Sequence, residues 1–260
     1  MWINMRIHKN EVPRFQRLFQ GFLIFVMLPV ACTSTGSISA PQQGMVFVPA
    51  GTFRMGTDLS ESDADATPQH SVMLEAFWIG RDEVTNAEYR VCVQADACPE
   101  PQDLRFYDDP AYADHPVVYV TWYAAQDYCG WAGKRLPAEA EWEKAARGAE
   151  DFSFPWGNEF DPERLNAGRQ LEGTTEVGSY PQGASPYGAL DMAGNVWEWV
   201  ADWYAAYPGS SYWSDFYGEK YKVVRGGSWN HPVEDAHTYH RDIAHPGRAL
   251  AVVGFRCAKK

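Results

Sequence analysis

The stretch ALDMAGNVWEWVADW, from Ala189 to Trp203, says more about the fold than any other part of the sequence. It carries two carboxylates, Asp191 and Glu198, on either side of a glycine-containing turn. Such a turn can bring side-chain and backbone oxygens to one point, and a hard cation binds several oxygen ligands together. The pattern therefore predicts a calcium site made by Asp191, Gly194, Val196 and Glu198.

The same stretch also has a purely structural interpretation. Trp197 and Trp199 would pack in the core, while a tight turn leaves the two acids in water. The spacing of the residues does not decide between this interpretation and a calcium site.

The N-terminal part of the predicted domain contains strand patterns. Residues 45–57 alternate apolar and small side chains and predict a strand, a turn at Gly51 and a second strand. Residues 58–70 are acidic and without periodicity, which predicts an exposed loop. Residues 70–80 predict one short strand.

Three helices are expected in the middle of the chain. Thr85 and Glu88 form the capping-box pattern at the start of the first helix. Thr121 can cap a second helix, which Gly133 can end. Residues 134–148 predict a third helix, with glutamates towards its start and basic residues towards its end, an order that the helix dipole favours.

The composition favours one α+β domain with many loops. A chain of 260 residues can bury a sizeable core as a single domain. No amphipathic helix pattern follows Phe152, and the dense aromatic residues suggest that large side chains hold irregular segments in place. The net charge of −12 and the absence of a basic run argue against nucleic acid as a partner.

The first 44 residues predict export. Arg14 and Arg17 precede an apolar run of about fifteen residues, the length of a signal-peptide core rather than of a membrane span. Residues 1–32 end in LPVAC, which is similar to a bacterial lipobox in which Cys32 would carry a lipid. An ordinary signal peptide or an uncleaved anchor is the alternative. Residues 33–44 resemble a flexible tether, so the predicted location is the periplasm, with membrane attachment through the N-terminus.

The other four cysteines, Cys92, Cys98, Cys129 and Cys257, form an even set. In an exported protein an even set favours disulfides. Cys92 and Cys98 are close enough in sequence to close one short loop, which leaves Cys129 and Cys257 to close a long one. Buried free thiols are the alternative.

Three histidines are concentrated in VVRGGSWNHPVEDAHTYH, residues 223–240. If this segment were helical, His237 and His240 would share a face and could bind a metal together with His231. Pro232 opposes a long helix. Exposed histidines on an irregular loop are therefore the alternative to a metal site.

Several segments together resemble the formylglycine-generating enzyme, or sulfatase-modifying factor, family. The resemblance covers residues 45–260 and runs in order through MVFVPAGTFRMGT, DEVTNAEYRVCV, YCGWAGKRLPAEAEWEKAARG, YGALDMAGNVWEWVADWY, VVRGGSW and VGFRCAKK. It implies a single compact α+β domain with little regular structure, related to C-type-lectin folds, with calcium at the four residues named above. It also implies the Cys129–Cys257 bridge, and Asn166 and Ala167 match part of a second calcium site.

The resemblance does not extend to two functional positions of the family. Family members that oxidise a sulfatase cysteine to formylglycine carry two cysteines shortly after the GGS-aromatic segment, and their thiolates bind copper(I), a soft metal. Counted from Ser228, these positions are His231 and Ala236 in this sequence. Copper–thiolate chemistry is therefore not expected.

Three functions are compatible with this resemblance. The first is a non-catalytic module that holds a peptide or protein client. The second is a divergent metal-dependent oxidase or maturation enzyme, in which His231, His237 and His240 would bind iron. The third is formylglycine-generating activity retained by another route, which the missing cysteine pair opposes.

Overall fold

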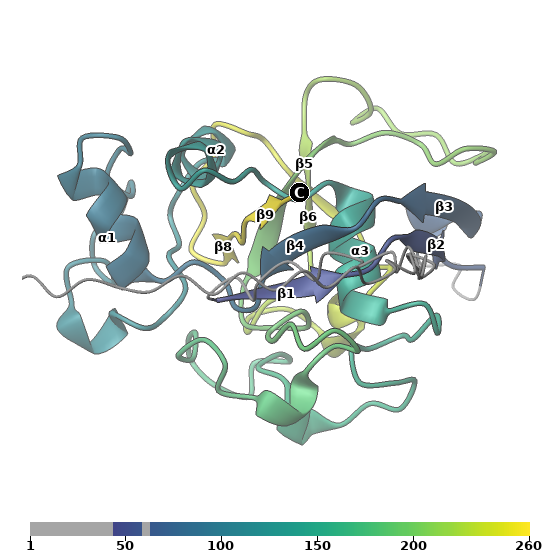
Figure 1. Cartoon of the computed structure of the whole chain (residues 1–260), viewed down its shortest axis with the longest axis horizontal. Coiled ribbons are helices and arrows are strands. Elements are labelled where there is room, and N and C mark those ends of the chain that lie inside the picture. The colour runs from purple at the N-terminus through teal and green to yellow at the C-terminus, as the bar shows by residue number, and fades with distance from the viewer. Residues whose placement is uncertain (1–43, 59–62) are drawn as a thin grey trace, which may run out of the picture. The chain divides into compact units, whose positions relative to one another are not determined.

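The largest sheet in the described chain has four strands and contains residues 197–203, the second part of the stretch 189–203. The description comes from a computed structural model and covers residues 44–58 and 63–260. In the order in which they pair, the strands are β7 (Asp242–Ala244), β6 (Lys222–Arg225), β5 (Trp197–Trp203) and β8 (Val253–Gly254) (Figure 1). β8 runs parallel to β5, and the other pairs are antiparallel. Every residue of β6 is buried, so this strand lies inside the domain.

Two smaller sheets contain the N-terminal strands. One is formed by β1 (Met45–Val48), β4 (Phe77–Gly80) and β9 (Ala258–Lys259), and the other by β2 (Gly51–Met55) and β3 (His70–Leu74). The two strands predicted in residues 45–57 are confirmed, although they pair with different partners. The prediction of one strand over residues 70–80 is wrong, because the chain leaves its pairing with β2 after Leu74 and joins the other sheet at Phe77.

The three predicted helices are confirmed as α1 (Asn86–Gln94), α2 (Trp122–Trp131) and α3 (Glu139–Arg147). At α1, Thr85 and Glu88 make both bonds of the capping box: each backbone N–H donates to the other residue's side chain. At α2, the Thr121 hydroxyl accepts from the Ala124 N–H at 3.1 Å.

Gly133 ends α2 as predicted. Its φ is +68°, a left-handed conformation that favours glycine. The Gly133 N–H donates to the Gly130 carbonyl, and the Lys134 N–H donates to the Cys129 carbonyl. These two bonds form a Schellman motif, which satisfies the last carbonyls of the helix.

After α3 the described chain contains no further α-helix, as the sequence predicted. Short 3-10 helices occur at Ala64–Ala66, Pro110–Tyr112, Pro162–Arg164, Pro181–Gly183 and Val233–Ala236. Within residues 44–58 and 63–260, no helix has both the length and the apolar character needed to cross a membrane.

The described residues of the segment 58–70, which was predicted to be an exposed loop, are partly buried. Asp63 is 5% exposed and Ala66 is completely buried. The Ala66 carbonyl accepts from the Thr57 N–H, and the Arg241 guanidinium donates to the Asp65 carbonyl. The acidic composition suggested solvent exposure, but these contacts hold the segment against distant parts of the chain.

Both predicted disulfides are present. Cys92, near the end of α1, pairs with Cys98, and Cys129 of α2 pairs with Cys257 next to β9. The alternative of buried free thiols is therefore wrong for these four residues.

The two tryptophans of the stretch 189–203 pack in the core. Trp197 and Trp199 are 2% and 0% exposed. The structural interpretation placed the two acids in water, and this part of it is wrong: Asp191 is 6% exposed and Glu198 is completely buried. Buried carboxylates need partners.

Candidate functional site

The turn after β6 lies within residues 223–240, which we call the histidine segment because they contain His231, His237 and His240. Gly226 and Gly227 have φ values of +97° and +74°, which favour glycine. A Cβ atom on Gly227 would lie 3.0 Å from backbone atoms of Asp235 and Ala236. The second glycine therefore allows a close backbone approach and leaves the next residue, Ser228, completely buried.

Two of the three candidate histidines meet at Trp197, on the first residue of β5. The ring of His231 lies edge-on to Trp197, with 5.6 Å between centroids, and the ring of His240 lies 5.8 Å away. His231 Nδ1 also forms a 2.6 Å hydrogen bond with the Ser228 hydroxyl. We call Trp197, Ser228, His231 and His240 the histidine site.

The third candidate, His237, packs elsewhere. Its ring stacks on Tyr239 and contacts Phe154, with centroid separations of 5.0 and 4.8 Å. Burial lowers the pKa of His237, which favours the neutral ring. The structure thus brings His231 and His240 to one tryptophan and places His237 in an aromatic cluster.

His240 is held between two carboxylates. Its Nδ1 lies 2.5 Å from Asp63 Oδ1, and its Nε2 lies 3.7 Å from Asp235 Oδ1. Burial on its own would lower the pKa of His240, but the hydrogen bond and negative charge of Asp63, with the charge of Asp235, outweigh it and raise that pKa. The arrangement therefore favours an imidazolium, a charged hydrogen-bond donor.

The indole of Trp197 carries an unused donor. Its Nε1 is buried and has no hydrogen-bond partner among the described residues. A buried donor without a partner costs free energy, so a ligand oxygen or a water molecule at this nitrogen would be stabilised.

A buried network of ion pairs supports the histidine site. We call it the ionic layer, and it consists of Glu139 and Glu143 of α3, Arg225 of β6 and Arg241. Arg225 donates to both glutamates, at 2.8 and 2.6 Å. Arg241 donates to Glu139 at 2.7 Å. Burial would raise the pKa of Glu139, but the charges of Arg241 and Arg225 outweigh it and lower that pKa.

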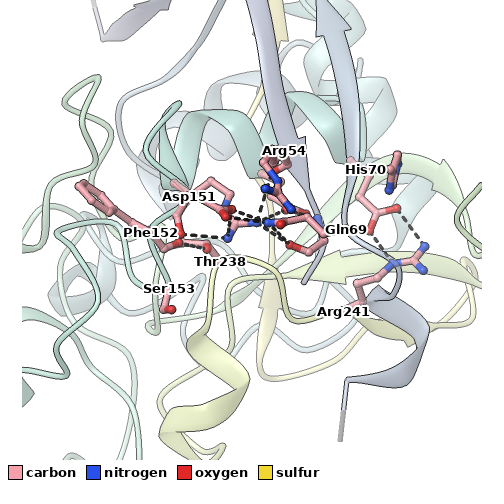
Figure 2. A network of polar contacts seen from close by, with 12 residues as sticks. Arg54, Gln69, His70, Asp151, Phe152, Ser153, Thr238 and Arg241 are labelled. Atoms are coloured by element: carbon pink, nitrogen blue, oxygen red, sulfur yellow. Dashed lines mark hydrogen bonds and ion pairs between the residues drawn. The ribbon is translucent and has the colours of Figure 1, made fainter. Parts of the chain in front are cut away.

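The ionic layer also fixes the backbone of the histidine segment. Arg225 donates to the Thr238 carbonyl at 2.6 Å. Thr238 in turn donates its hydroxyl to the Phe152 carbonyl and its N–H to the Ser153 carbonyl, and Figure 2 shows these residues together. The histidine segment is therefore hydrogen-bonded both to Arg225 of β6 and to the backbone at residues 152–153.

A second polar contact joins the β2–β3 region to the chain after α3. The Gln69 amide donates to both carboxylate oxygens of Asp151, at 2.6 and 2.8 Å (Figure 2). Arg147, at the end of α3, pairs with the same carboxylate at 2.6 Å. These bonds connect α3 to the segment that contains Asp63.

The sequence interpretation missed the ionic layer. It attributed the charges of α3 to the helix dipole, yet Glu139, Glu143 and Arg147 are all buried. The available signal was their spacing, because residues four apart share one helix face. Arg225, placed directly after two valines in a buried strand, was a second signal.

The two carboxylates of the predicted calcium site have protein partners. The Asp191 carboxylate accepts from the Gly178 N–H at 2.6 Å, and burial raises its pKa to about 6. Both oxygens of Glu198 accept from Arg256, at 2.6 and 2.7 Å. Glu198 also accepts from the Trp142 indole at 2.9 Å.

A further buried acid, Glu83, belongs to the same cluster. It accepts from the Asn195 amide at 2.8 Å and from the Val196 N–H at 3.3 Å. Burial raises its pKa well above the usual range, and the charges of Asp191 and Glu198 add to that effect. No pattern in the sequence predicted that Glu83 would belong to this cluster.

This donor set fits calcium in composition. The Arg256 guanidinium bonds to the Glu198 carboxylate and interacts through its charge with the buried carboxylates of Glu83 and Asp191, and calcium prefers such oxygen-rich, negatively charged surroundings. Among the described residues, however, no three acidic, histidine or cysteine side chains converge closely enough to hold a metal. Calcium would therefore rely on backbone oxygens such as those of Gly194 and Val196, and the site stays a prediction.

The residues of the second predicted calcium site lie next to the first. A Cβ atom on Gly194 would lie 2.5 Å from the Asn166 carbonyl oxygen, so this contact requires glycine. The Asn166 side-chain amide donates to the Gly173 carbonyl, and its Oδ1 is buried without a partner among the described residues. Ala167 is completely buried. Asn166 Oδ1 is thus an oxygen available for a cation.

The N-terminal predictions fall outside the described residues. The predicted signal peptide, the lipidation site Cys32 and all of the tether except Gly44 lie there.

Comparison with known proteins identifies the domain. The sequence profile described as the sulfatase-modifying factor enzyme 1-like domain matches residues 33–260. The chain belongs to this sulfatase-modifying factor family. The predicted family and its α+β fold with few helices are thereby confirmed.

Curated relatives of this family carry different names. Serine/threonine-protein kinase pkn1 of Chlamydia caviae is 36% identical over 249 residues, which cover 83% of this chain and 38% of that protein. The formylglycine-generating enzyme of Bos taurus is 30% identical over 290 residues, which cover 86% of this chain and 76% of the enzyme. The chain therefore spans less than two fifths of the length of the Pkn1 kinase and about three quarters of the length of the formylglycine-generating enzyme.

A solved structure agrees with this assignment. PvdO from Pseudomonas aeruginosa superposes with a TM-score of 0.69 at 30% identity, covering 83% of this chain and 94% of PvdO. The likeness extends over nearly all of PvdO.

Proposed function

We propose that this family domain binds a peptide or protein client and does not oxidise it. The observation on which this proposal depends is that all four cysteines in the described residues form disulfides, so none of them is a free thiol. At the two positions where copper-binding thiolates would stand, His231 bonds to Ser228, and Ala236 is completely buried. No thiolate pair is available there to bind copper(I).

The histidine site supports binding of a polar main chain or side chain. It combines the indole N–H of Trp197, which has no partner, with His231 Nε2, which makes no hydrogen bond among the described residues, while Asp63 and Asp235 hold the neighbouring His240 ring in place. These donors suit carbonyl or carboxylate oxygens. The ionic layer holds the segment in place before binding, which reduces the entropy lost when a client is ordered.

The same proposal places the domain outside the cytoplasm. Two disulfides favour an oxidising compartment. A signal peptide and a lipid on Cys32 would attach the domain to a membrane in the periplasm. A lipid-modified N-terminal peptide, identified by mass spectrometry of membrane fractions, would support this part of the proposal.

Crosslinking of the exported protein in cells tests the client. A photocrosslinker at exposed Glu234, beside the histidine site, should capture a discrete partner. The capture should weaken when His240 is replaced by Gln. A crosslinker at exposed Asp215, in a different loop, serves as the control.

Metal analysis and an activity assay separate the alternatives. Stoichiometric iron or copper that is lost in His231→Ala or His240→Ala would favour the divergent oxidase instead. Conversion of a sulfatase-type cysteine peptide to its aldehyde would favour formylglycine-generating activity and contradict the proposal.

A further inference from the structure

A pocket unrelated to the histidine site is lined by exposed residues of α2, the helix that contacts α1. We call it the α2 pocket, and it is lined by Ala97, Gln126, Asp127, Gly130, Trp131, Lys134 and Arg135. Its volume is about 540 Å³, within the usual range for sites that bind small molecules. It shares no residue with the ionic layer or the predicted calcium sites.

Trp131 gives the pocket an aromatic surface. Its side chain is 42% exposed, although tryptophan is usually well buried. The ring is supported by Tyr128, with 5.8 Å between centroids, and Tyr128 itself is buried. The indole is therefore held in place while part of it remains open to solvent.

Polar side chains with spare hydrogen-bonding capacity surround this ring. No hydrogen bond or ion pair among the described residues involves the side chains of Gln126, Asp127 or Lys134. Arg135, by contrast, donates through two nitrogens to the Glu141 carboxylate, each at 2.6 Å. The pocket thus has three uncommitted polar side chains.

The charges around the pocket cancel. The carboxylate of Asp127 offsets the ammonium of Lys134, and Glu141 offsets Arg135. The pocket therefore has no net charge that would attract an ionic ligand. A purely apolar ligand would displace the water that hydrates Gln126, Asp127 and Lys134, and it would not replace the lost hydrogen bonds.

The frame of the pocket is rigid. Ala97 precedes Cys98 of one disulfide, and Gly130 follows Cys129 of the other. The Schellman motif at Gly133 and the ion pair of Arg135 fix the end of α2. A ligand would therefore meet a surface that is already formed, which favours binding.

We infer that the α2 pocket binds a neutral saccharide. The apolar face of a sugar ring stacks on Trp131, and the ring hydroxyls exchange hydrogen bonds with Gln126, Asp127 and Lys134. Hydroxyls both donate and accept, which matches one amide, one carboxylate and one ammonium. This activity is independent of the proposed client binding, because the two sites share no residue.

Titration of the exported protein with saccharides tests this inference. The probes are chitotriose, cellotriose and maltotriose at up to about 10 mM, a range that detects millimolar affinities. Binding is measured by isothermal titration calorimetry, which needs no tryptophan reporter and serves every variant, and in the wild type also by the NMR signal of the Trp131 indole. At least one probe should give a saturable change, and Trp131→Ala should weaken its binding about tenfold or more.

Substitution of Gly130 tests the location of the binding site more directly, because a larger side chain at this position would fill the pocket. A Cβ atom at this position meets nothing within 4 Å, and the residue lies in α2 without a positive φ. Gly130→Leu should therefore fold normally, fill the pocket and abolish binding. Gly173→Leu is the matched control, because Gly173 is equally open and lies outside the pocket.

Two outcomes would overturn the inference. One is the absence of a saturable change with all three probes. The other is binding that persists unchanged in both Gly130→Leu and Trp131→Ala, which would place the saccharide elsewhere. Client capture at the histidine site should be unaffected by either variant, so failure of one proposal is distinguishable from failure of the other.

Discussion

Arg225 Nη2 lies 2.6 Å from Glu143 Oε2, and both side chains are completely buried. The pair joins the central sheet to α3, and Arg225 also bonds to the histidine segment through the Thr238 carbonyl. Removing one member of a buried pair leaves the other charge uncompensated in the interior. The position of the histidine site and the stability of the domain therefore depend on the same contact.

Replacing Arg225 by Met should lower the free energy of unfolding by about 3 to 5 kcal/mol, because it leaves Glu139 and Glu143 without their shared partner. Urea denaturation followed by circular dichroism, with the disulfides intact, measures this loss. The control is Lys260→Met, which breaks a pair whose members are 74% and 80% exposed and should lower the free energy of unfolding far less than Arg225→Met does. Equal losses in the two variants would contradict a supporting role for the ionic layer.

Replacing Asp63 by Asn should lower the pKa of His240. In the folded wild type this pKa is raised, because Asp63 and Asp235 together outweigh burial. The resulting stabilisation is complete below the unfolded pKa of about 6.5 and is lost as the pH rises through the folded value. NMR titration of the His240 Cε1 proton measures the shift directly, and His240→Gln assigns the signal.

Stability measurements provide a second test of the same contact. The wild type should lose stability as the pH rises through the folded pKa of His240, and Asp63→Asn should lose less over that interval. Asp235→Asn is the matched comparison, with a smaller expected shift because its oxygen lies 3.7 Å from His240 Nε2. An unchanged His240 titration in Asp63→Asn would exclude the pairing.

These contacts show which features the sequence could predict. The capping box of Thr85 and Glu88 and the glycine that ends α2 involve neighbouring residues, so their patterns were visible in the sequence. The two disulfides were predictable because the predicted export favours disulfides and because Cys92 and Cys98 are close in sequence, which leaves Cys129 and Cys257 to pair.

Long-range polar contacts were not predictable in this way. Asp63 and His240 are 177 residues apart, and Glu139 and Arg241 are 102 residues apart. No local period connects such residues, because the fold alone brings them together. For the same reason, the acidic composition of residues 58–70 suggested a solvent-exposed loop, although Asp63 and Ala66 are buried.

The two disulfides should differ in their effect on stability. The Cys129–Cys257 bridge closes a separation of 128 residues and the Cys92–Cys98 bridge one of 6. In the chain-entropy description these correspond to about 5 and about 2 kcal/mol. Urea denaturation of Cys129→Ala/Cys257→Ala and Cys92→Ala/Cys98→Ala measures both losses. A larger loss for the short loop would show that native packing around α1, rather than chain entropy, dominates.

Replacing Asp191 by Asn should remove most of the thermal stabilisation by calcium. The asparagine oxygen can still accept from the Gly178 N–H, so the local backbone is retained while the negative charge is lost. In the wild type, calcium at about 100 times its dissociation constant should stabilise the fold by about 2.7 kcal/mol. Thermal unfolding with added calcium or with a chelator measures this difference, and Asp215→Asn, in an exposed loop, is the control. Glu198→Ala is a poor substitute, because it also leaves Arg256 buried without its partner. If Asp191→Asn keeps the full response to calcium, the ion binds elsewhere and the predicted site is wrong.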